Sequence, residues 1–564
     1  MEAATASPRP NPRTPAPWPY DRPLRAWQAA ALEQVMARPA GDFLTAATPA
    51  AGKTTFGLRV AHALLSAGAV SRVAVVGPTA HICRQWAAAA AALGIDLDPN
   101  RANAEGHEPP DRHGTAVTYQ AIAAGPVVHR RATASRPTLL IADEPHHMGE
   151  DAAWGRSAEL GFGGARLRLL LSGTPFRSDA AAIPFVGYDD TGLSRADHTY
   201  GYTAALVDGV CRPITFLAYD GEMEWESGGR RRRAGFDLVL PKAESARRLR
   251  TALDAEGDWI AQVLRDGDAR LTTVRAAGHP DAGGLVIAAN KLHARRLAER
   301  LAAIAGERVE VVTSDDPDAS ARIEAFAAGR ARWLVSVLMV SEGVDIPRLR
   351  VGVYATAART ELFFRQVVGR FVRRTARPSR QMSYLLLPAD PQLKALAAKV
   401  EEERRHALDL RPGLEEMLGE RPAERLESGD AFLALSSSAH LEDVIRSTTQ
   451  PGDALALFAD ADQPEFATRA PGAGPAEIVA QRVAPPPAYV LRERARETRN
   501  RLVGDLARLT GESHATIHGE VNRATGARTV ADATHEQLDD GNARLERELA
   551  RVSRGRGRPR SRRA

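Results

Sequence analysis

The chain has 564 residues, of which 44% are hydrophobic and 26% are charged, and its formal net charge is +5. This length and balance exclude a single small domain and a fibrous chain, so we expect two to four globular domains. Two cysteines, Cys83 and Cys211, exclude a disulfide framework and zinc-ligand spacing, and we expect both to be small buried hydrophobes. No apolar run approaches the roughly 18 residues of a membrane span, so we expect no membrane partner.

Residues 1–20 are rich in Pro, Ala and Thr and lack an apolar core. We therefore expect a disordered N-terminus that is not a secretory signal, in a cytoplasmic protein. Residues 23–33 follow with apolar side chains at helical spacing. Gln28 in this helix has an amide that could bind the edge of an adenine, although a glutamine on a helix is more often only solvated.

The stretch Phe43–Thr55 predicts a strand, a tight loop and a helix, because an apolar run leads through small residues into a helical pattern. In such a loop the backbone N–H groups and the helix N-terminus cradle phosphates. Lys53 would reach the phosphates, and the hydroxyl of Thr54 would hold Mg²⁺. Ala47 stands where the usual pattern has its first glycine, so this stretch alone leaves an ordinary loop equally open.

A pair of carboxylates follows another apolar strand, Thr138–Ala142. An aspartate at the end of a buried strand, here Asp143, can hold Mg²⁺ through water. The next residue, Glu144, can orient and deprotonate an attacking water molecule. This pair is therefore a candidate for phosphoryl-transfer chemistry.

Other strands of the first half also lead into short segments that contain polar residues: Pro78 and Thr79, Thr118 and Gln120, and Ser172 to Thr174. Strands that alternate with helical stretches predict a parallel α/β sheet. The functional loops of such a sheet lie at the carboxyl ends of its strands. We therefore expect these polar residues to lie at one edge of a common sheet.

The alternation stops at residues 206–280, where Arg230–Arg233 predicts an exposed loop tip, either solvated or in contact with nucleic acid. It returns at residue 284, and one of the later strands ends in Thr313. A helix over Glu361–Arg374 then places Gln366, Arg370 and Arg373 within about one turn of each other. Arginines so grouped can clamp a phosphate, because guanidinium is a planar bidentate donor, although a basic helix face is usually only solvated.

The ordered set of these stretches resembles the superfamily 2 helicase/translocase family, DExH group, over roughly residues 21–390. Five of its motifs are matched, by Ala51–Thr54 (motif I, with a relaxed first glycine), Asp143–His146 (II), Ser172–Thr174 (III), Gly343–Pro347 (V) and Gln366–Arg373 (VI). The Glu-Pro-His-His form of motif II and the sequence Ser-Gly-Thr-Pro-Phe-Arg at motif III most resemble those of bacterial and phage enzymes that are related to the helicase part of restriction systems.

The resemblance implies an α/β fold with two RecA-like parallel-sheet domains in tandem, plus a mainly helical C-terminal region, and it implies ATP and Mg²⁺ as cofactors. The implied catalytic residues are Lys53, Asp143, Glu144, His146, Gln366, Arg370 and Arg373. Those implied to bind the nucleotide are Arg25, Gln28, Ala51, Gly52, Lys53, Thr54, Thr55, Gly343 and Asp345, with Thr54 and Asp143 on Mg²⁺. Those implied to contact nucleic acid are Pro78, Thr79, Thr118, Gln120 and Thr313. We expect His147 to be a packed histidine.

We expect seven segments along the chain. They are a disordered N-terminus (1–20), RecA-like domain 1 (21–205), a linker or insert (206–280), RecA-like domain 2 (281–395), a helical region and linker (396–488), a small helical module (489–550) and a disordered arginine-rich tail (551–564). Clustered arginines bind polyanions, so the tail is expected to anchor nucleic acid, although a tail that only aids solubility stays open. The helical module could bind DNA or a partner protein.

Two hypotheses of function follow. The first is an ATP-driven helicase or translocase on DNA or RNA, with DNA favoured by the restriction-like motifs. The second is a nucleic-acid-stimulated ATPase switch or recruitment subunit of a DNA-repair or defence complex, which separates no strands. A non-catalytic scaffold is disfavoured, because Lys53, Asp143, Glu144, Arg370 and Arg373 are all present.

Overall fold

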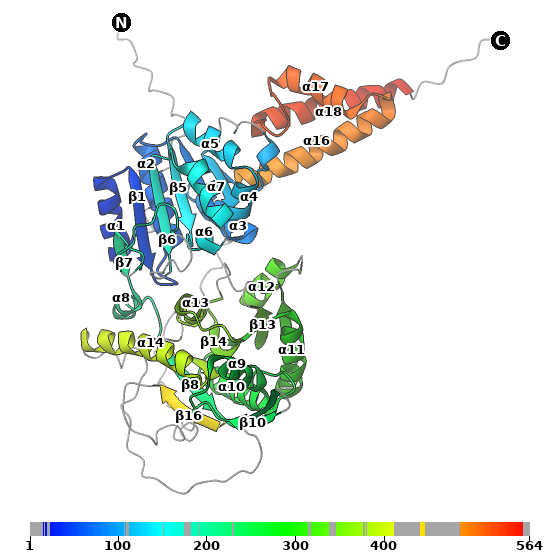
Figure 1. Cartoon of the computed structure of the whole chain (residues 1–564). Helices are drawn as coiled ribbons and strands as arrows, with labels where there is room; N and C mark the ends of the chain where they lie inside the picture. The colour runs from blue at the N-terminus through cyan, green and yellow to red at the C-terminus, as the bar shows by residue number, and fades with distance from the viewer. Residues whose placement is uncertain are drawn as a thin grey trace, which may run out of the picture. The chain divides into compact units, whose positions relative to one another are not determined.

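The structure is a computed structural model of the whole chain (Figure 1). It describes residues 15, 17–19, 23–105, 108, 112–150, 152–173, 182–190, 192–227, 230–313, 316, 318–337, 346–375, 378, 381–410, 440–445 and 486–556. The chain divides into two compact units. The first contains Met1–Thr45, Lys53–His198 and Ala473–Ala564, and the second contains Ala46–Gly52 and Thr199–Gly472.

A seven-stranded sheet forms the centre of the first unit, with the order β3-β4-β2-β5-β6-β1-β7. The strands β2, β3, β4, β5 and β6 pair in parallel along this order. Strands of parallel sheets are buried on both faces, which explains the continuous apolar runs of the sequence. The strands are β1 (Gly41–Ala47), β2 (Arg72–Gly77), β3 (Leu97–Asp98), β4 (Gly114–Thr118), β5 (Thr138–Asp143), β6 (Leu167–Ser172) and β7 (His198–Tyr200).

Helices cover this sheet and fill its core. Ala74 of β2 and Leu140 of β5 pack in one cluster with Ile122, Ala158 and Phe162 from the helices that follow β4 and β5. The helices of this part are α1 (Ala26–Ala37), α2 (Lys53–Ser66), α3 (Ala80–Ala91), η1 (Asn103–Glu105), α4 (Tyr119–Ala124), α5 (Pro126–Ser135), α6 (His147–Glu150) and α7 (Ala152–Phe162). The alternation of strand and helix thus produces the α/β sheet that the sequence predicted.

The second unit is built around another seven-stranded sheet, of order β12-β13-β11-β14-β15-β8-β16. Its neighbouring strands pair in parallel, except that β16 runs antiparallel to β8. The strands are β8 (Ile214–Asp220), β11 (Gly283–Ala288), β12 (Glu310–Val312), β13 (Trp333–Val337), β14 (Leu349–Ala355), β15 (Ser383–Pro388) and β16 (His440–Ile445). Two parallel-sheet α/β domains are therefore present, which confirms the predicted fold class.

Residues 206–280, expected to be a linker or insert, contain regular structure. Within them β8 pairs with β15, and α10 (Asp258–Ala276) places Gly267 close to Val353 of β14. The other helices of the unit are α8 (Tyr202–Val207), α9 (Lys242–Ala252), α11 (Lys291–Ala305), α12 (Ala319–Ala328), α13 (Glu361–Phe371) and α14 (Pro391–Leu410). The segment is thus part of the second unit and adds a strand to its sheet.

The arginine run that was expected at a loop tip forms a strand instead. β10 (Arg230–Ala234) pairs antiparallel with β9 (Met223–Ser227). Three of its arginines lie within ion-pair distance of glutamates: Arg231 of Glu224, Arg232 of Glu244 and Arg233 of Glu222. Carboxylates next to each of these arginines reduce the positive potential that would attract a phosphate backbone. These three arginines are therefore better described as members of surface ion pairs.

Three C-terminal helices lie side by side, drawn in orange and red in Figure 1: α16 (Ala488–Thr510), α17 (His514–Thr525) and α18 (His535–Arg556). They share a small core of their own that includes Val503, Ile517 and Leu545. Gly511, at a φ of 80°, ends α16 in the left-handed region that favours glycine. These helices confirm the predicted mainly helical C-terminal region. No helix in the described part of the chain is long and apolar enough to cross a membrane.

This helical module belongs to the first unit. Arg492 of α16 donates to Asp96 at 2.6 Å, and Asn100 donates to Glu493 at 3.2 Å. At the other end, α18 continues to Arg556, where a disordered tail had been expected from residue 551. An ion pair between Glu548 and Arg551, one turn apart, supports this extension. Of the expected tail, residues 557–564 lie outside the described residues.

Candidate functional site

The loop between β1 and α2 has the backbone of a tight phosphate-type turn. Ala50 has a φ of 68° and Gly52 a φ of 92°, both in the left-handed region. Such a conformation suits glycine and strains alanine, and strained backbone is concentrated at functional sites. The N–H of Ala51, which is fully buried, donates to the carbonyl of Thr48 at 3.1 Å. α2 then begins at Lys53, so the N-terminus of the helix opens at the end of this loop.

Lys53 is paired with the second carboxylate of the Asp143–Glu144 pair. Its Nζ donates to Oε1 of Glu144 at 2.7 Å, with 14% and 24% of the two side chains exposed. The other carboxylate oxygen accepts from the backbone N–H of Gly173 at 3.1 Å. The start of α2 and the ends of β5 and β6 therefore meet at Glu144, as the predicted gathering of strand ends requires.

Two backbone features allow this close approach. Glu144 has a φ of 52°, which is uncommon for a residue other than glycine. At Gly173 a Cβ atom would lie 3.3 Å from Nζ of Lys53 and 3.5 Å from Oε1 of Glu144. A larger side chain would crowd the ion pair, which explains on steric grounds why motif III has a glycine at this position. Thr174 of this motif lies outside the described residues.

Asp143 is held by two aromatic residues from neighbouring segments. Nε1–H of Trp86 donates to its carboxylate at 2.9 Å, and the hydroxyl of Tyr119 donates to its backbone carbonyl at 2.9 Å. The sequence analysis assigned neither residue to the site, because no local pattern connects α3 and α4 to the end of β5. Only the strand order, with β2 next to β5 and β4 on the other side of β2, shows why the helices that follow β2 and β4 reach Asp143.

The two adjacent carboxylates have opposite pKa shifts. Burial and the negative charge of Glu144 raise the pKa of Asp143 to about 6. Burial alone would also raise the pKa of Glu144, but Lys53 and His146 outweigh it and lower this pKa to about 2. A divalent cation would relieve the repulsion between two such carboxylates. The carboxylate of Asp143 and the half-buried hydroxyl of Thr54 are the oxygen ligands that Mg²⁺ prefers, so the residues fit this ion.

His146 and His147 are both buried. Nδ1 of His146 lies 3.6 Å from Oε2 of Glu144, which places this ring beside the candidate base. The ring of His147 lies 4.4 Å from that of His146 and 6.3 Å from that of Tyr119. His147 is thus packed among aromatic rings, as expected.

Gln28 and Arg25 stabilise the start of α1. The side-chain oxygen of Gln28 accepts from the backbone N–H of Arg25 at 2.9 Å, and Gln28 is only 3% exposed. This bond is one half of a capping box, which satisfies a donor at the start of a helix. An adenine-binding role for these residues stays a prediction.

Two of the residues expected to contact nucleic acid serve as helix caps. The hydroxyl of Thr79 accepts from the N–H of Ile82 at 3.3 Å, and that of Thr118 accepts from the N–H of Ala121 at 3.1 Å. Gly77 and Thr118 are paired in register, so α3 and α4 begin beside each other at the carboxyl ends of β2 and β4. Pro78 is half-buried and Gln120 is exposed.

In the second unit, α13 carries Gln366 and Arg370, and Arg373 follows its end; all three are partly exposed. Thr313, just after β12, is buried. Gly343 and Asp345 lie outside the described residues.

A buried arginine that the sequence analysis missed supports the end of α13. The guanidinium of Arg212 donates to the carbonyls of Phe371 at 2.7 Å and Pro347 at 2.8 Å. It thereby joins the end of motif VI to the last residue of motif V. The contact spans 159 residues of sequence, and no local signal marks it.

Two mycobacterial proteins align with nearly the whole chain. Uncharacterized protein Rv2917 of Mycobacterium tuberculosis (strain ATCC 25618 / H37Rv) is 43% identical over 557 residues, and Uncharacterized protein ML1624 of Mycobacterium leprae (strain TN) is 42% identical over 554 residues. Each alignment covers 92% of this chain and 92% of the relative. The chain belongs to the family of these proteins.

A family model also matches part of the chain. Residues 21–177 match the model described as type III restriction enzyme, res subunit. This region holds motifs I, II and III, so the match confirms the resemblance to a superfamily 2 helicase close to the helicase part of restriction enzymes.

Two solved structures are similar at low identity. One is the ATP-dependent type ISP restriction-modification enzyme LlaBIII bound to DNA, at 15% identity and a TM-score of 0.44, over 70% of this chain and 31% of that chain. The other is S. cerevisiae Dbp5 bound to RNA and ADP BeF3, at 14% identity and a TM-score of 0.45, over 71% of this chain and 94% of that chain. The family assignment rests on the relatives and the family model, not on these structures.

Proposed function

We propose that the chain is an ATP hydrolase that couples turnover to movement on a nucleic-acid strand, as a cytoplasmic helicase or translocase with DNA as its preferred strand. The observation that carries the proposal is the meeting of Lys53, at the start of α2, with Glu144 and Gly173, which follow the ends of β5 and β6. A phosphate-binding lysine, a carboxylate base and a backbone donor are thus held together beside a helix N-terminus. The match of residues 21–177 to a restriction-enzyme helicase family supports DNA as the substrate.

The ion pair between Lys53 and Glu144 suggests how binding prepares hydrolysis. Lys53 would exchange the carboxylate for the β- and γ-phosphates of ATP. Glu144 would then be released to orient a water molecule and accept its proton, while the N–H of Gly173 still fixes one of its oxygens. Mg²⁺, held through Thr54 and Asp143, would supply charge neutralisation at the phosphates when bound. His146, beside Glu144, would couple the nucleotide site to the second RecA-like domain.

The remaining residues take supporting roles in this proposal. Arg370 and Arg373 supply positive charge to the phosphoryl-transfer transition state, with Gln366 on the same helix. Arg25, Gln28, Ala51, Gly52, Thr55, Gly343 and Asp345 bind the nucleotide.

For nucleic acid, we propose the surface of the first unit formed by Pro78, Thr79, Thr118 and Gln120. Thr313, a buried residue of the second unit, is a separate candidate. The hydroxyls of Thr79 and Thr118 already cap helices, so the contacts would come from the N-terminus of α3 and the exposed amide of Gln120. A helix N-terminus attracts phosphate groups.

A second candidate function is an ATP-gated switch or recruitment subunit of a DNA-repair or defence complex. The helical module α16–α18 favours it, because the module has its own core and is joined to the first unit through Arg492 and Asp96. A small folded module fixed to an ATPase domain suits the docking of a partner protein as well as DNA.

One assay separates the two functions. ATP turnover, strand separation and displacement of a protein block are measured together on tailed duplexes of DNA and of RNA, with Lys53→Ala as the control. ATP-dependent separation that is lost in Lys53→Ala supports a helicase. Stimulated turnover with neither separation nor displacement of a protein block favours the switch. Absence of turnover on both polymers rejects both functions.

A further inference from the structure

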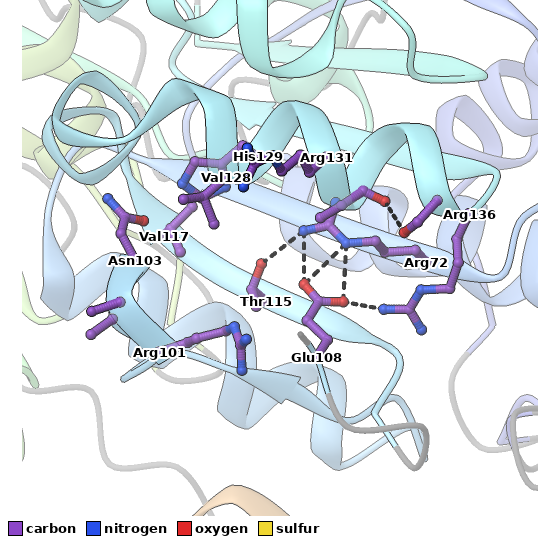
Figure 2. Close-up of a pocket in the computed structure, with 14 residues that line it drawn as sticks. Arg72, Arg101, Asn103, Glu108, Thr115, Val117, Val128, His129, Arg131 and Arg136 are labelled. Atoms are coloured by element: carbon purple, nitrogen blue, oxygen red, sulfur yellow. Dashed lines mark hydrogen bonds and ion pairs between the residues drawn. The ribbon is translucent and has the colours of Figure 1, made fainter. Parts of the chain in front are cut away.

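A hollow lies in the first unit, at the opposite ends of the strands from Lys53 and Glu144. It is lined by Arg72, the first residue of β2, by Thr115 near the start of β4, and by one side of α5. Figure 2 shows α5 lying over these strands, with Arg101 and Glu108 on the segment below the helix. The volume of the hollow is about 450 Å³, within the range of small-ligand sites.

Arg72 is the most deeply buried charge of this hollow. It is 1% exposed, and its Nε and Nη2 donate to Glu108 at 3.0 and 2.8 Å. Its third nitrogen, Nη1, is buried and has no hydrogen-bond partner among the described residues. A buried donor without a partner carries its full desolvation cost, which an acceptor on a bound ligand would remove.

His129 of α5 adds a second buried group of this kind. It is 5% exposed, and its Nε2 has no hydrogen-bond partner within the described part of the chain. Its ring packs against Phe162 with the centroids 5.7 Å apart, which fixes its position. Burial, together with the charge of Arg72, lowers the pKa of His129 to about 4, so the ring is neutral near pH 7.

The lining is rich in positive charge. Arg72, Arg101, Arg131 and Arg136 all line the hollow, and Glu108 is the carboxylate among the described lining residues. Glu108 forms ion pairs with both Arg72 and Arg136, as the dashed lines of Figure 2 mark. The described lining residues thus comprise four guanidinium groups and one carboxylate, which gives this described lining a net positive charge.

We propose that this hollow is a binding site for the phosphate group of a small ligand, up to the size of a mononucleotide. Guanidinium groups bind phosphate through paired charge-assisted hydrogen bonds. The unpartnered nitrogen of Arg72 and that of His129 provide two further polar contacts. The hollow lies between a helix and the starts of two strands, which suits a small molecule better than a continuous strand of nucleic acid.

Two neighbouring arginines of α5 offer a matched test. Arg131 lines the hollow, whereas Arg130 is exposed and does not line it. Binding of inorganic phosphate and of AMP to the full chain is measured by calorimetry, in a Lys53→Ala background that weakens binding at the phosphate loop. We expect Arg131→Gln, and separately Arg101→Gln, to weaken phosphate binding about tenfold, the cost of one charge-assisted hydrogen bond, and Arg130→Gln to leave it unchanged.

Each outcome decides the proposal. If AMP binds more tightly than phosphate, the rest of the hollow binds the nucleoside part of the ligand. If the two probes bind equally, the hollow recognises the phosphate group alone. Both results support the site. No binding of either probe up to about 10 mM overturns it. So does equal weakening by Arg130→Gln and Arg131→Gln, or binding that Arg131→Gln and Arg101→Gln both leave unchanged. ATP turnover does not enter the test, so its result is independent of the function proposed above.

Discussion

Nζ of Lys53 lies 2.7 Å from Oε1 of Glu144, and this ion pair joins the first residue of α2 to the residue after β5. The lysine expected to bind phosphate and the carboxylate expected to activate water thus hold each other. ATP would compete with Glu144 for the same ammonium group. Binding of the nucleotide and release of the base would therefore be one event.

We expect Glu144→Gln to keep ATP binding and to lose turnover. The two donors bond to different carboxylate oxygens of Glu144, so the single amide oxygen of glutamine can accept from Lys53 or from the N–H of Gly173, and Lys53 stays in place to bind the phosphates. The amide cannot accept the proton of the attacking water, and loss of a general base costs about 10²–10⁴ in rate. ATP affinity and kcat are measured on the same preparation. Loss of ATP binding in a folded variant would contradict the assigned role.

Arg370→Ala and Arg373→Ala should each lower kcat, on the order of 10³-fold for an arginine that stabilises the transition state. Arg365→Ala on the same helix is the control, because its guanidinium is held by Glu361 and by Glu403 at 2.6 Å. We expect this control to change kcat by less than about threefold. If both test variants fall by less than about tenfold, neither arginine acts on the phosphates.

Removal of residues 557–564 tests the arginine tail without shortening α18, which ends at Arg556. The deleted segment holds four arginines (558, 560, 562 and 563), and each phosphate they neutralise releases a counterion. We expect the salt dependence of DNA binding to become less steep by up to about 3 in log–log slope, with basal ATPase unchanged. An unchanged slope would remove the tail from the binding surface.

Removing residues 489–564 extends this test to the helical module. If DNA-stimulated ATPase activity falls below that of the tail deletion, the module binds DNA. Stimulation equal to that of the tail deletion would assign the module to a protein partner.

We expect His129 to lower the stability of the first unit as the pH falls from about 6.5 toward 4, whereas Asp143, whose pKa is raised to about 6, acts in the opposite direction and offsets part of this loss. The pKa of His129 is lowered from 6.5 to about 4, because burial and Arg72 disfavour the imidazolium. The unfolded chain then binds more protons than the native one in this window, so protonation favours unfolding. The contribution reaches about 3 kcal/mol for a shift of this size.

Glu108 extends the same trend to lower pH. Burial would raise its pKa, but Arg72 and Arg136 outweigh burial and lower it below 4.5, so its stabilisation is lost as the pH falls through the native pKa. Thermal unfolding of the wild type and His129→Gln is followed from pH 7 to pH 4.5. The loss of stability in this range should be smaller in the variant, and identical profiles would contradict this account.

Local pattern was enough to predict the strand ends that carry the chemistry. Asp143 and Glu144 were predicted because an apolar run of strand length ends directly at two carboxylates. Contacts between distant segments could not be predicted in this way. Arg212 bonds to a carbonyl 159 residues later, β8 joins a sheet whose other strands lie after residue 280, and Arg72 pairs with Glu108. These contacts depend on which strands become neighbours, which hydrophobic periodicity does not encode.

Single-turnover ATP hydrolysis by Lys53→Ala, with and without single-stranded DNA, tests the central claim most directly. Lys242→Ala, an exposed lysine at the start of α9, is the matched control. Loss of the phosphate-binding charge should lower the rate by at least about 10²-fold while the melting profile is kept, and the control should match the wild type. Near-normal hydrolysis by Lys53→Ala would contradict the account that this loop binds and activates ATP.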